Sequence, residues 1–145
     1  MDVFKTMDVI GSGLTAERTR LNAIASNVAN ANSIKGVNGG PYKRKDVVLE
    51  SVPMESEFAK ALDGQGGNTH TEVRVAQIID DPHPARLVYK PDHPEANHEG
   101  YVAMPNVNPV EEMANMISAD RAYQANVNVF QTTKHMALKA LEIGR

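Results

Sequence analysis

Cysteine and tryptophan are both absent from this chain of 145 residues. Without cysteine, neither a disulfide framework nor a thiolate metal site can form. Aromatic residues make up only 5% of the chain, so few bulky side chains exist to anchor a globular core. Small or flexible side chains, chiefly alanine, valine and methionine, must therefore make most of the packing contacts.

The chain also lacks a strong net charge and any long apolar run. Its formal net charge of −3 disfavours a general nucleic-acid binder, because phosphate neutralisation requires a basic surface. The short basic cluster of Lys43, Arg44 and Lys45 is interpreted as a solvated strand face. No run approaches the ~20 apolar residues of a membrane-spanning helix, and no basic segment followed by an apolar core marks a Sec signal. We therefore expect no nucleic-acid partner and no membrane insertion.

The last part of the chain predicts one long helix between Asn108 and Gly144. Asn108 is a suitable N-cap, Pro109 fits the first turn, and Glu111 stands at the capping-box position. Glu111 and Glu112 would face the positive end of the helix dipole. No proline follows, so the helix would contain roughly 35 residues and span about 50 Å. Its apolar residues recur at helical spacing, at Met113, Met116, Ile117, Tyr123, Val127, Phe130, Ala137, Leu138 and Leu141.

A second, shorter helix is expected from Val3 to an asparagine-rich segment. Its apolar residues follow a heptad, with Val3, Ile10, Ile24 and Ala31 on one track and Met7, Leu14, Leu21 and Val28 on the other. Gly11 and Gly13 each lower helix propensity by about 1 kcal/mol, but the stripe continues in phase through them, which favours one helix. The helix end is interpreted as fraying at the run Asn27, Asn30, Asn32 and Ser33, before Gly36.

Between the helices the sequence predicts a small β-rich segment. Strands are expected at residues 42–52, 71–79, 86–90 and 100–104. The second of these should bury Val73, Val75 and Ile78 on one face. A short helix at residues 55–62 and a flexible glycine-rich loop at residues 63–68 complete the segment.

These elements predict a mainly α fold with a small β-rich insertion. Because the chain leaves through one long helix and returns through the other, their simplest pairing is an antiparallel coiled coil. Residues 1–35 and 106–145 then form a terminal helical domain, and residues 36–105 form a middle segment with hairpin-like strands and flexible loops. Ordering ~29 residues of the first helix costs more than its apolar burial provides, and backbone hydrogen bonds bring the sum only near zero, so we expect frayed or disordered terminal helices that order against neighbouring subunits.

Several segments resemble one protein family. Residues 14–32 resemble the N-terminal signature of bacterial flagellar axial proteins, the family of rod, hook and hook-junction subunits, and read LTAERTRLNAIASNVANAN. Three further segments resemble the proximal-rod branch of that family, namely GYVAMPNVN at 100–108, EEMANMI at 111–117 and RAYQANV at 121–127. Residues 33–42 depart from the family, because this link is longer and richer in glycine than usual.

The resemblance implies a structural subunit of the flagellar basal-body rod, without enzyme activity or cofactor. Such subunits pack their terminal helices together and against neighbours in a helical, tubular drive shaft across the periplasm. They are exported unfolded by the flagellar type III system, without a cleaved signal peptide. The implied partners are other rod proteins and copies of the chain itself, with rod-base and export-gate proteins as further candidates.

The expected subunit interface consists of apolar side chains on both helices. These are Val3, Met7, Ile10, Leu14, Leu21, Ile24, Val28, Met113, Met116, Ile117, Tyr123, Val127, Phe130, Leu138 and Leu141. On periodicity alone, the same stripes also fit the buried core of a monomeric helical hairpin. A coiled-coil adaptor that binds one partner helix and never polymerises is the alternative function.

Enzyme and metal sites find little support. The sequence places several ionisable residues close together, at Asp80, Asp81, His83, Asp92, His93, His98 and Glu99. Their spacing matches no metal motif, and the prolines between them indicate surface turns. Ser12 lies between two glycines but lacks the preceding strand of a nucleophile elbow and the third glycine of a dinucleotide loop. We therefore assign no catalytic, cofactor-binding or metal-binding residue.

Overall fold

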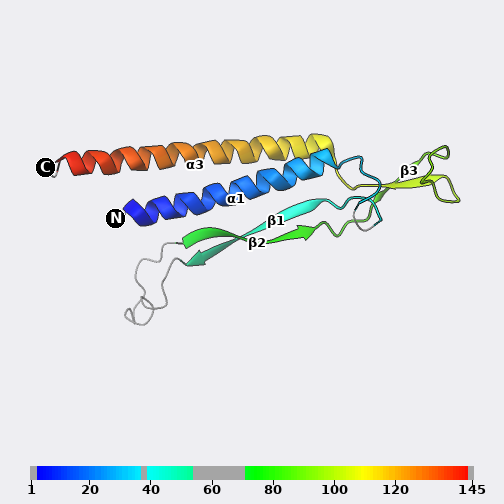
Figure 1. Ribbon diagram of the computed structural model, residues 1–145, viewed down its shortest axis with the longest axis horizontal. Coiled ribbons are helices and arrows are strands. Elements are labelled where there is room, and N and C mark those ends of the chain that lie inside the picture. Colours follow the sequence, from blue (N-terminus) through cyan, green and yellow to red (C-terminus); the bar gives the residue numbers. More distant parts are fainter. Residues whose placement is uncertain (1–2, 37–38, 54–70, 144–145) are drawn as a thin grey trace. The chain divides into compact units, whose positions relative to one another are not determined.

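The computed structural model describes residues 3–36, 39–53 and 71–143. Its elements, in chain order, are helix α1 (Val3–Ala29), strands β1 (Lys45–Pro53), β2 (Thr71–Asp80), β3 (Arg86–Tyr89) and β4 (Tyr101–Met104), and helix α3 (Pro109–Ile143) (Figure 1). The prediction of two long terminal helices with a small β-rich segment between them is confirmed. The helix expected at residues 55–62 and the loop expected at 63–68 lie outside the described residues.

Helix α3 is the longest element, with 35 residues, and it begins where the sequence predicts. The N–H group of Val110 donates to Asn108 Oδ1 at 3.2 Å, and that of Glu112 donates to the Asn108 carbonyl at 3.0 Å. Asn108 is therefore the N-cap. Pro109 occupies the first helical position, where its missing N–H group costs nothing.

Helix α1 contains 27 residues and passes through Gly11 and Gly13 without interruption, as predicted. Packing explains the glycine at position 13, because a Cβ atom there would lie 3.3 Å from Nδ2 of Asn126 on α3. Nothing lies within 4 Å of a Cβ atom built on Gly11. Only the second glycine thus lies where α3 approaches closely.

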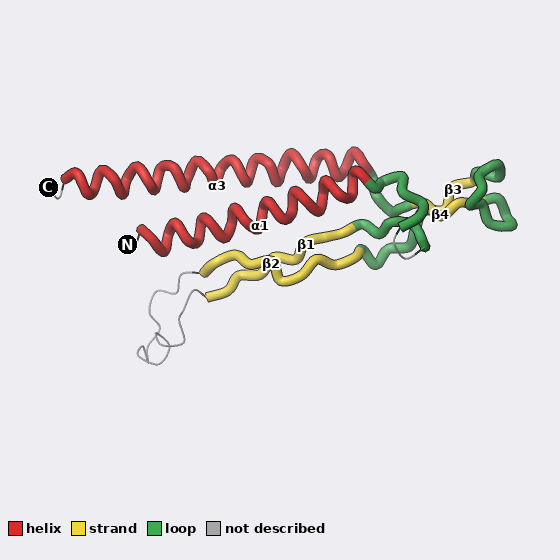
Figure 2. The backbone as a smooth tube through the Cα atoms, viewed as in Figure 1, coloured by secondary structure: helices red, strands yellow, loops and turns green. Residues whose placement is uncertain are grey.

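Within the described residues, four strands form two small sheets. Strand β1 pairs with β2, and β3 pairs with β4 in antiparallel register from Arg86 opposite Met104 to Tyr89 opposite Tyr101 (Figure 2). The prediction that one face of β2 is buried is wrong for two residues, because Val73 is 36% exposed and Ile78 is 52% exposed. A sheet of only two strands leaves more of its surface uncovered than the alternating pattern of β2 implied.

The β3–β4 hairpin has its own packing. Val102 and Met104 are buried, and the rings of Tyr89 and Tyr101 meet edge to face with centroids 5.3 Å apart. Gly100 precedes β4 with a φ angle of +80°, and a Cβ atom there would lie 2.9 Å from the Tyr89 ring. The hairpin therefore requires glycine at this position for both conformation and space.

Two compact units divide the chain, and each contains helix and strand segments. One comprises Met1–Thr19, Val48–Gln77 and Ala119–Arg145, and the other comprises Arg20–Val47 and Ile78–Ser118. In the first unit, the N–H group of Val73 on β2 donates to Ser12 Oγ on α1 at 3.1 Å. The second unit contains the polar network described next.

Candidate functional site: the Asn27 junction

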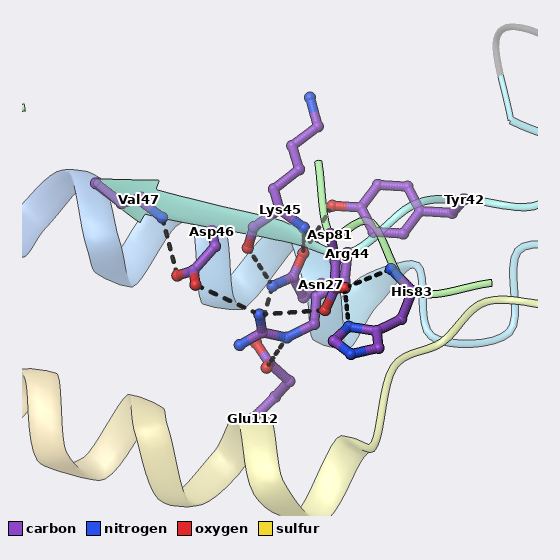
Figure 3. Close-up of polar contacts among 9 residues, drawn as sticks. All are labelled: Asn27, Tyr42, Arg44, Lys45, Asp46, Val47, Asp81, His83 and Glu112. Atoms are coloured by element: carbon purple, nitrogen blue, oxygen red, sulfur yellow. Dashed lines mark hydrogen bonds and ion pairs between the residues drawn. The ribbon is translucent and has the colours of Figure 1, made fainter. Parts of the chain in front are cut away.

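A polar network in the second unit joins α1, β1 and α3. We name it the Asn27 junction, and it consists of Asn27, Tyr42, Arg44, Lys45 and Glu112 (Figure 3). Asn27 lies in the last turn of α1, Tyr42 and Arg44 precede β1, Lys45 begins β1, and Glu112 lies in the first turn of α3. The junction thus connects segments from both ends and the middle of the chain.

Asn27 is fully buried, and its side-chain amide uses every hydrogen bond available to it. Its Nδ2 atom donates to the Lys45 carbonyl at 2.8 Å and to Glu112 Oε2 at 2.9 Å. Its Oδ1 atom accepts from the Lys45 N–H group at 2.8 Å and from the Tyr42 hydroxyl at 2.9 Å. Two donors and two lone pairs are all that a primary amide offers. The two bonds to Lys45 replace those of a neighbouring strand at the edge of β1.

Glu112 is only 1% exposed, and both of its carboxylate oxygens are bound. One accepts from Asn27, and the other accepts from Arg44 Nε at 2.8 Å. Burial alone lowers the pKa of Arg44, but the hydrogen bond to Glu112 and the nearby carboxylates of Glu112, Asp46 and Asp81 outweigh it and raise the pKa. Arg44 therefore remains a cation and compensates a charge that would be costly to bury alone.

Asp81 extends the network beyond the end of β2. Its N–H group donates to the Arg44 carbonyl at 2.8 Å, and its carboxylate lies 3.8 Å from Arg44 Nη1. Hydrogen bonds from the backbone and then the ring of His83 lower the pKa of Asp81. Asp81 is therefore an anion at neutral pH and adds to the negative charge around Arg44.

The structure corrects three interpretations of these residues. Asn27 is not part of a fraying helix end, because it is fully buried and bonded on every side. The basic cluster is not one solvated face, since Arg44 turns into the junction while Lys43 and Lys45 are exposed. Glu112 was expected only to interact with the helix dipole, but its carboxylate also forms an ion pair with Arg44.

One sequence signal could have identified Asn27. It lies between Ile24 and Val28, at the edge of an apolar heptad track. An asparagine among buried heptad positions indicates a polar partner, as it does in coiled coils. The identity of that partner could not be found in the same way, because Glu112 lies 85 residues further along the chain.

The predicted interface residues fall into three groups by exposure. Ile24 is buried. Ten are partly buried, namely Val3, Met7, Ile10, Leu14, Leu21, Val28, Met116, Tyr123, Val127 and Phe130. Four are between 48% and 73% exposed, namely Met113, Ile117, Leu138 and Leu141.

On α3, the covered face and the exposed apolar residues are different stripes. The covered face steps by four and three residues through Glu112, Met116, Ala119, Tyr123, Asn126, Phe130, Thr133 and Ala137, all buried or partly buried. Ile117 and Leu138 lie next to this face, 138 − 117 = 21 residues apart, which is three heptads. Ile117 and Leu138 therefore share one side of the helix, whereas the exposed Val129 and Met136 lie on another side.

Two of the residues considered for catalysis or metal binding, Ser12 and His93, make local hydrogen bonds. Ser12 Oγ donates to the Val9 carbonyl at 2.8 Å, and the Glu95 N–H group donates to His93 Nδ1 at 3.1 Å. Within the described ranges, no three histidine or acidic side chains are grouped as metal ligands. Neither of the helices described has the apolar length that crossing a bilayer needs.

Comparison with known proteins matches both ends of the chain to one kind of protein. Residues 7–33 match the family "Flagella basal body rod protein", and residues 98–143 match "Flagellar basal body rod FlgEFG protein C-terminal". The chain is 48% identical to the flagellar basal-body rod protein FlgC of Yersinia enterocolitica and 43% identical to that of Salmonella typhimurium, over the full length of both chains. FlgC of Bacillus subtilis is 43% identical over 152 residues, again with complete coverage. Asn27 and Glu112 both lie in the segments that the family comparisons match.

Proposed function

The chain belongs to the flagellar basal-body rod protein family, as a structural subunit of the FlgC type, and on this basis we propose how its helices assemble. We propose that α1 and α3 pair as an antiparallel coiled coil. Neighbouring subunits then cover the apolar residues that this pair leaves exposed. The product is a helical, tubular shaft, the proximal part of the rod.

Two close approaches support the antiparallel pairing. Gly13 lies against Asn126 in the first unit, and Asn27 bonds to Glu112 in the second. The step is 27 − 13 = 14 residues on α1 and 126 − 112 = 14 residues on α3, in opposite chain directions. Fourteen residues are two heptads, which is the period expected of a coiled-coil seam.

The proposal of a polymer rests mainly on the exposed apolar residues of α3. Met113 and Ile117 near its start are 53% and 56% exposed, and Leu141 near its end is 73% exposed. A monomer gains nothing from a row of such side chains, whereas a subunit can bury them against its neighbours. When the same contact repeats head to tail without closing a ring, it produces an open helical assembly.

The remaining parts of the proposal follow from the family. We propose copies of the chain and other rod proteins as partners, and rod-base and export-gate proteins as contacts at one end of the shaft. Residues 1–35 and 106–145 act as the assembling helical domain, and residues 36–105 as an outward segment. We assign a periplasmic location, type III export without a cleaved signal peptide, and no catalysis, cofactor or metal. Marginal terminal helices suit a chain that is exported unfolded.

Introducing charge into the exposed stripe tests this assembly. Ile117→Asp combined with Leu138→Asp should abolish filaments that the chain forms with other rod proteins, as seen by electron microscopy, because the subunit contact would bury both carboxylates. Ser118→Asp is the matched control, since Ser118 is exposed on the same helix but lies about 100° around its axis from Ile117 and about 160° from Leu138. Unchanged filaments in the double variant would contradict the proposed interface. Stable complexes with one partner and no filaments in the unaltered chain would favour the coiled-coil adaptor.

A further inference from the structure

We infer that Asn27 and Glu112 are specificity-determining residues for helix pairing: they select one register between α1 and α3. This inference rests on the antiparallel pairing proposed above. The two side chains are 0% and 1% exposed, and apolar side chains at these positions could also hold the helices together. Selection of the register is the role that we give to this buried polar pair.

Most side chains between α1 and α3 would fit equally well in neighbouring registers. The covered face of α3 repeats every seven residues and is mostly small or apolar, as at Ala119, Phe130 and Ala137, although Asn126 and Thr133 also lie on it. The apolar tracks of α1 have the same period, interrupted at Glu17. A shift by one heptad, about 10 Å along the axis, would therefore again place mostly small and apolar side chains against one another.

A shift of α3 in either direction removes hydrogen bonds of the Asn27 junction. If α3 moves one way, Asn27 faces Ala119, which has no group to accept a hydrogen bond from its Nδ2 atom. If α3 moves the other way, Asn27 faces Pro105, which lies before the helix begins and has no side-chain group to accept a hydrogen bond from its Nδ2 atom. In that second shift Glu112 would face the guanidinium of Arg20 instead of Arg44. Only the loss of the Asn27 hydrogen bond then disfavours the shifted register.

Either shift also separates Glu112 from Arg44, and the buried charge then loses a bond of 2.8 Å. Each buried polar group that loses its partner shifts an equilibrium by roughly 5- to 100-fold. With Asn27 and Glu112 both affected, we expect the native register to exceed the first shifted one by at least about 25-fold; the second shift, in which Arg20 replaces Arg44, is disfavoured by Asn27 alone, by at least about fivefold.

The absence of cysteine from the chain allows the register to be read by disulfide trapping. Gly13→Cys with Asn126→Cys reports the native register, because the two positions are in close contact. Gly13→Cys with Ala119→Cys, or with Thr133→Cys, reports a shift by one heptad in one direction or the other. All three pairs are placed in the full-length chain and oxidised under the same conditions.

In the unaltered background, the native pair should oxidise at least about 25-fold faster than the pair with Thr133→Cys and at least about fivefold faster than the pair with Ala119→Cys. In a background carrying Asn27→Leu and Glu112→Leu, both shifted pairs should come within about threefold of the native pair, while circular dichroism shows retained helix. Asn22→Leu is the matched control, because Asn22 is exposed on α1, and it should leave the ratio unchanged.

If the double leucine background loses its helices, Glu112→Gln provides a second variant. It keeps an acceptor for Asn27 but removes the ion pair with Arg44, and should raise trapping of the pair with Thr133→Cys about tenfold. Exclusive trapping of the native pair in a folded variant background would overturn the inference, because other contacts would then set the register. Failure to trap the native pair in the unaltered background would instead contradict the antiparallel pairing itself.

Discussion

Replacing Asn27 with alanine should destabilise the second unit more than any other single truncation of a polar side chain in the Asn27 junction. The change removes four hydrogen bonds of 2.8–2.9 Å at once. It leaves the Lys45 backbone groups, the Tyr42 hydroxyl and Glu112 Oε2 each without the partner that Asn27 supplied.

The expected size of the effect follows from those bonds. Three are between neutral groups, worth about 1 kcal/mol each, and the bond to the Glu112 carboxylate is worth about 1.5–3 kcal/mol. The Tyr42 hydroxyl lies 3.2 Å from Ser26 Oγ and can re-pair there, so its loss is largely recovered. We therefore expect Asn27→Ala to lower the free energy of unfolding by about 3.5–5 kcal/mol.

Urea unfolding followed by tyrosine fluorescence measures this loss. The chain has no tryptophan, and three of its four tyrosines, Tyr42, Tyr89 and Tyr101, lie in the second unit. Asn22→Ala, on the exposed side of the same helix, should change stability by less than about 0.5 kcal/mol. A loss below about 1 kcal/mol for Asn27→Ala, with an unchanged slope on urea, would refute the assignment of these bonds.

Two further predictions concern helix glycines and pH. Gly11→Ala should raise the free energy of unfolding by about 0.5–1 kcal/mol, because nothing lies within 4 Å of the new Cβ atom. Gly13→Ala should gain less or lose stability, since its Cβ atom would lie 3.3 Å from Asn126 Nδ2, and chemical denaturation compares the two variants directly. The pKa of Asp81 is lowered in the folded chain, so its contribution to stability is present above the unfolded value of about 3.9 and disappears as pH falls through the lowered pKa. His83→Ala should therefore destabilise the protein at pH 7 but make little difference once the pH has fallen below the lowered pKa of Asp81, as urea unfolding over a series of pH values would show.

Features that depend on neighbouring residues could be predicted from the sequence. The N-cap at Asn108, the uninterrupted α3 and the passage of α1 through its glycines all follow from local propensity and heptad spacing. The strands β1 to β4 were predicted to within a few residues for the same reason. The family could also be recognised, because its signature lies in a continuous run of the first helix.

Features that depend on distant residues could not be predicted. The partners of Asn27 lie 15, 18 and 85 residues away, and no local pattern relates them. Without those partners, a run of asparagines is typical of a helix end, which is how Asn27 was interpreted. Val73 and Ile78 alternate as buried strand residues do, but their exposure depends on how many strands the sheet contains. The subunit interface stays a prediction, because it involves molecules beyond this chain.

The bonds between Asn27 and Lys45 have a consequence for how such proteins vary. Both contacts reach the main chain of Lys45, and its side chain takes no part in them. Nineteen of the twenty amino acids supply the same two atoms, so substitutions at this position should be tolerated as long as proline is avoided. The side chain at this position therefore gives no indication that the backbone there makes an essential contact.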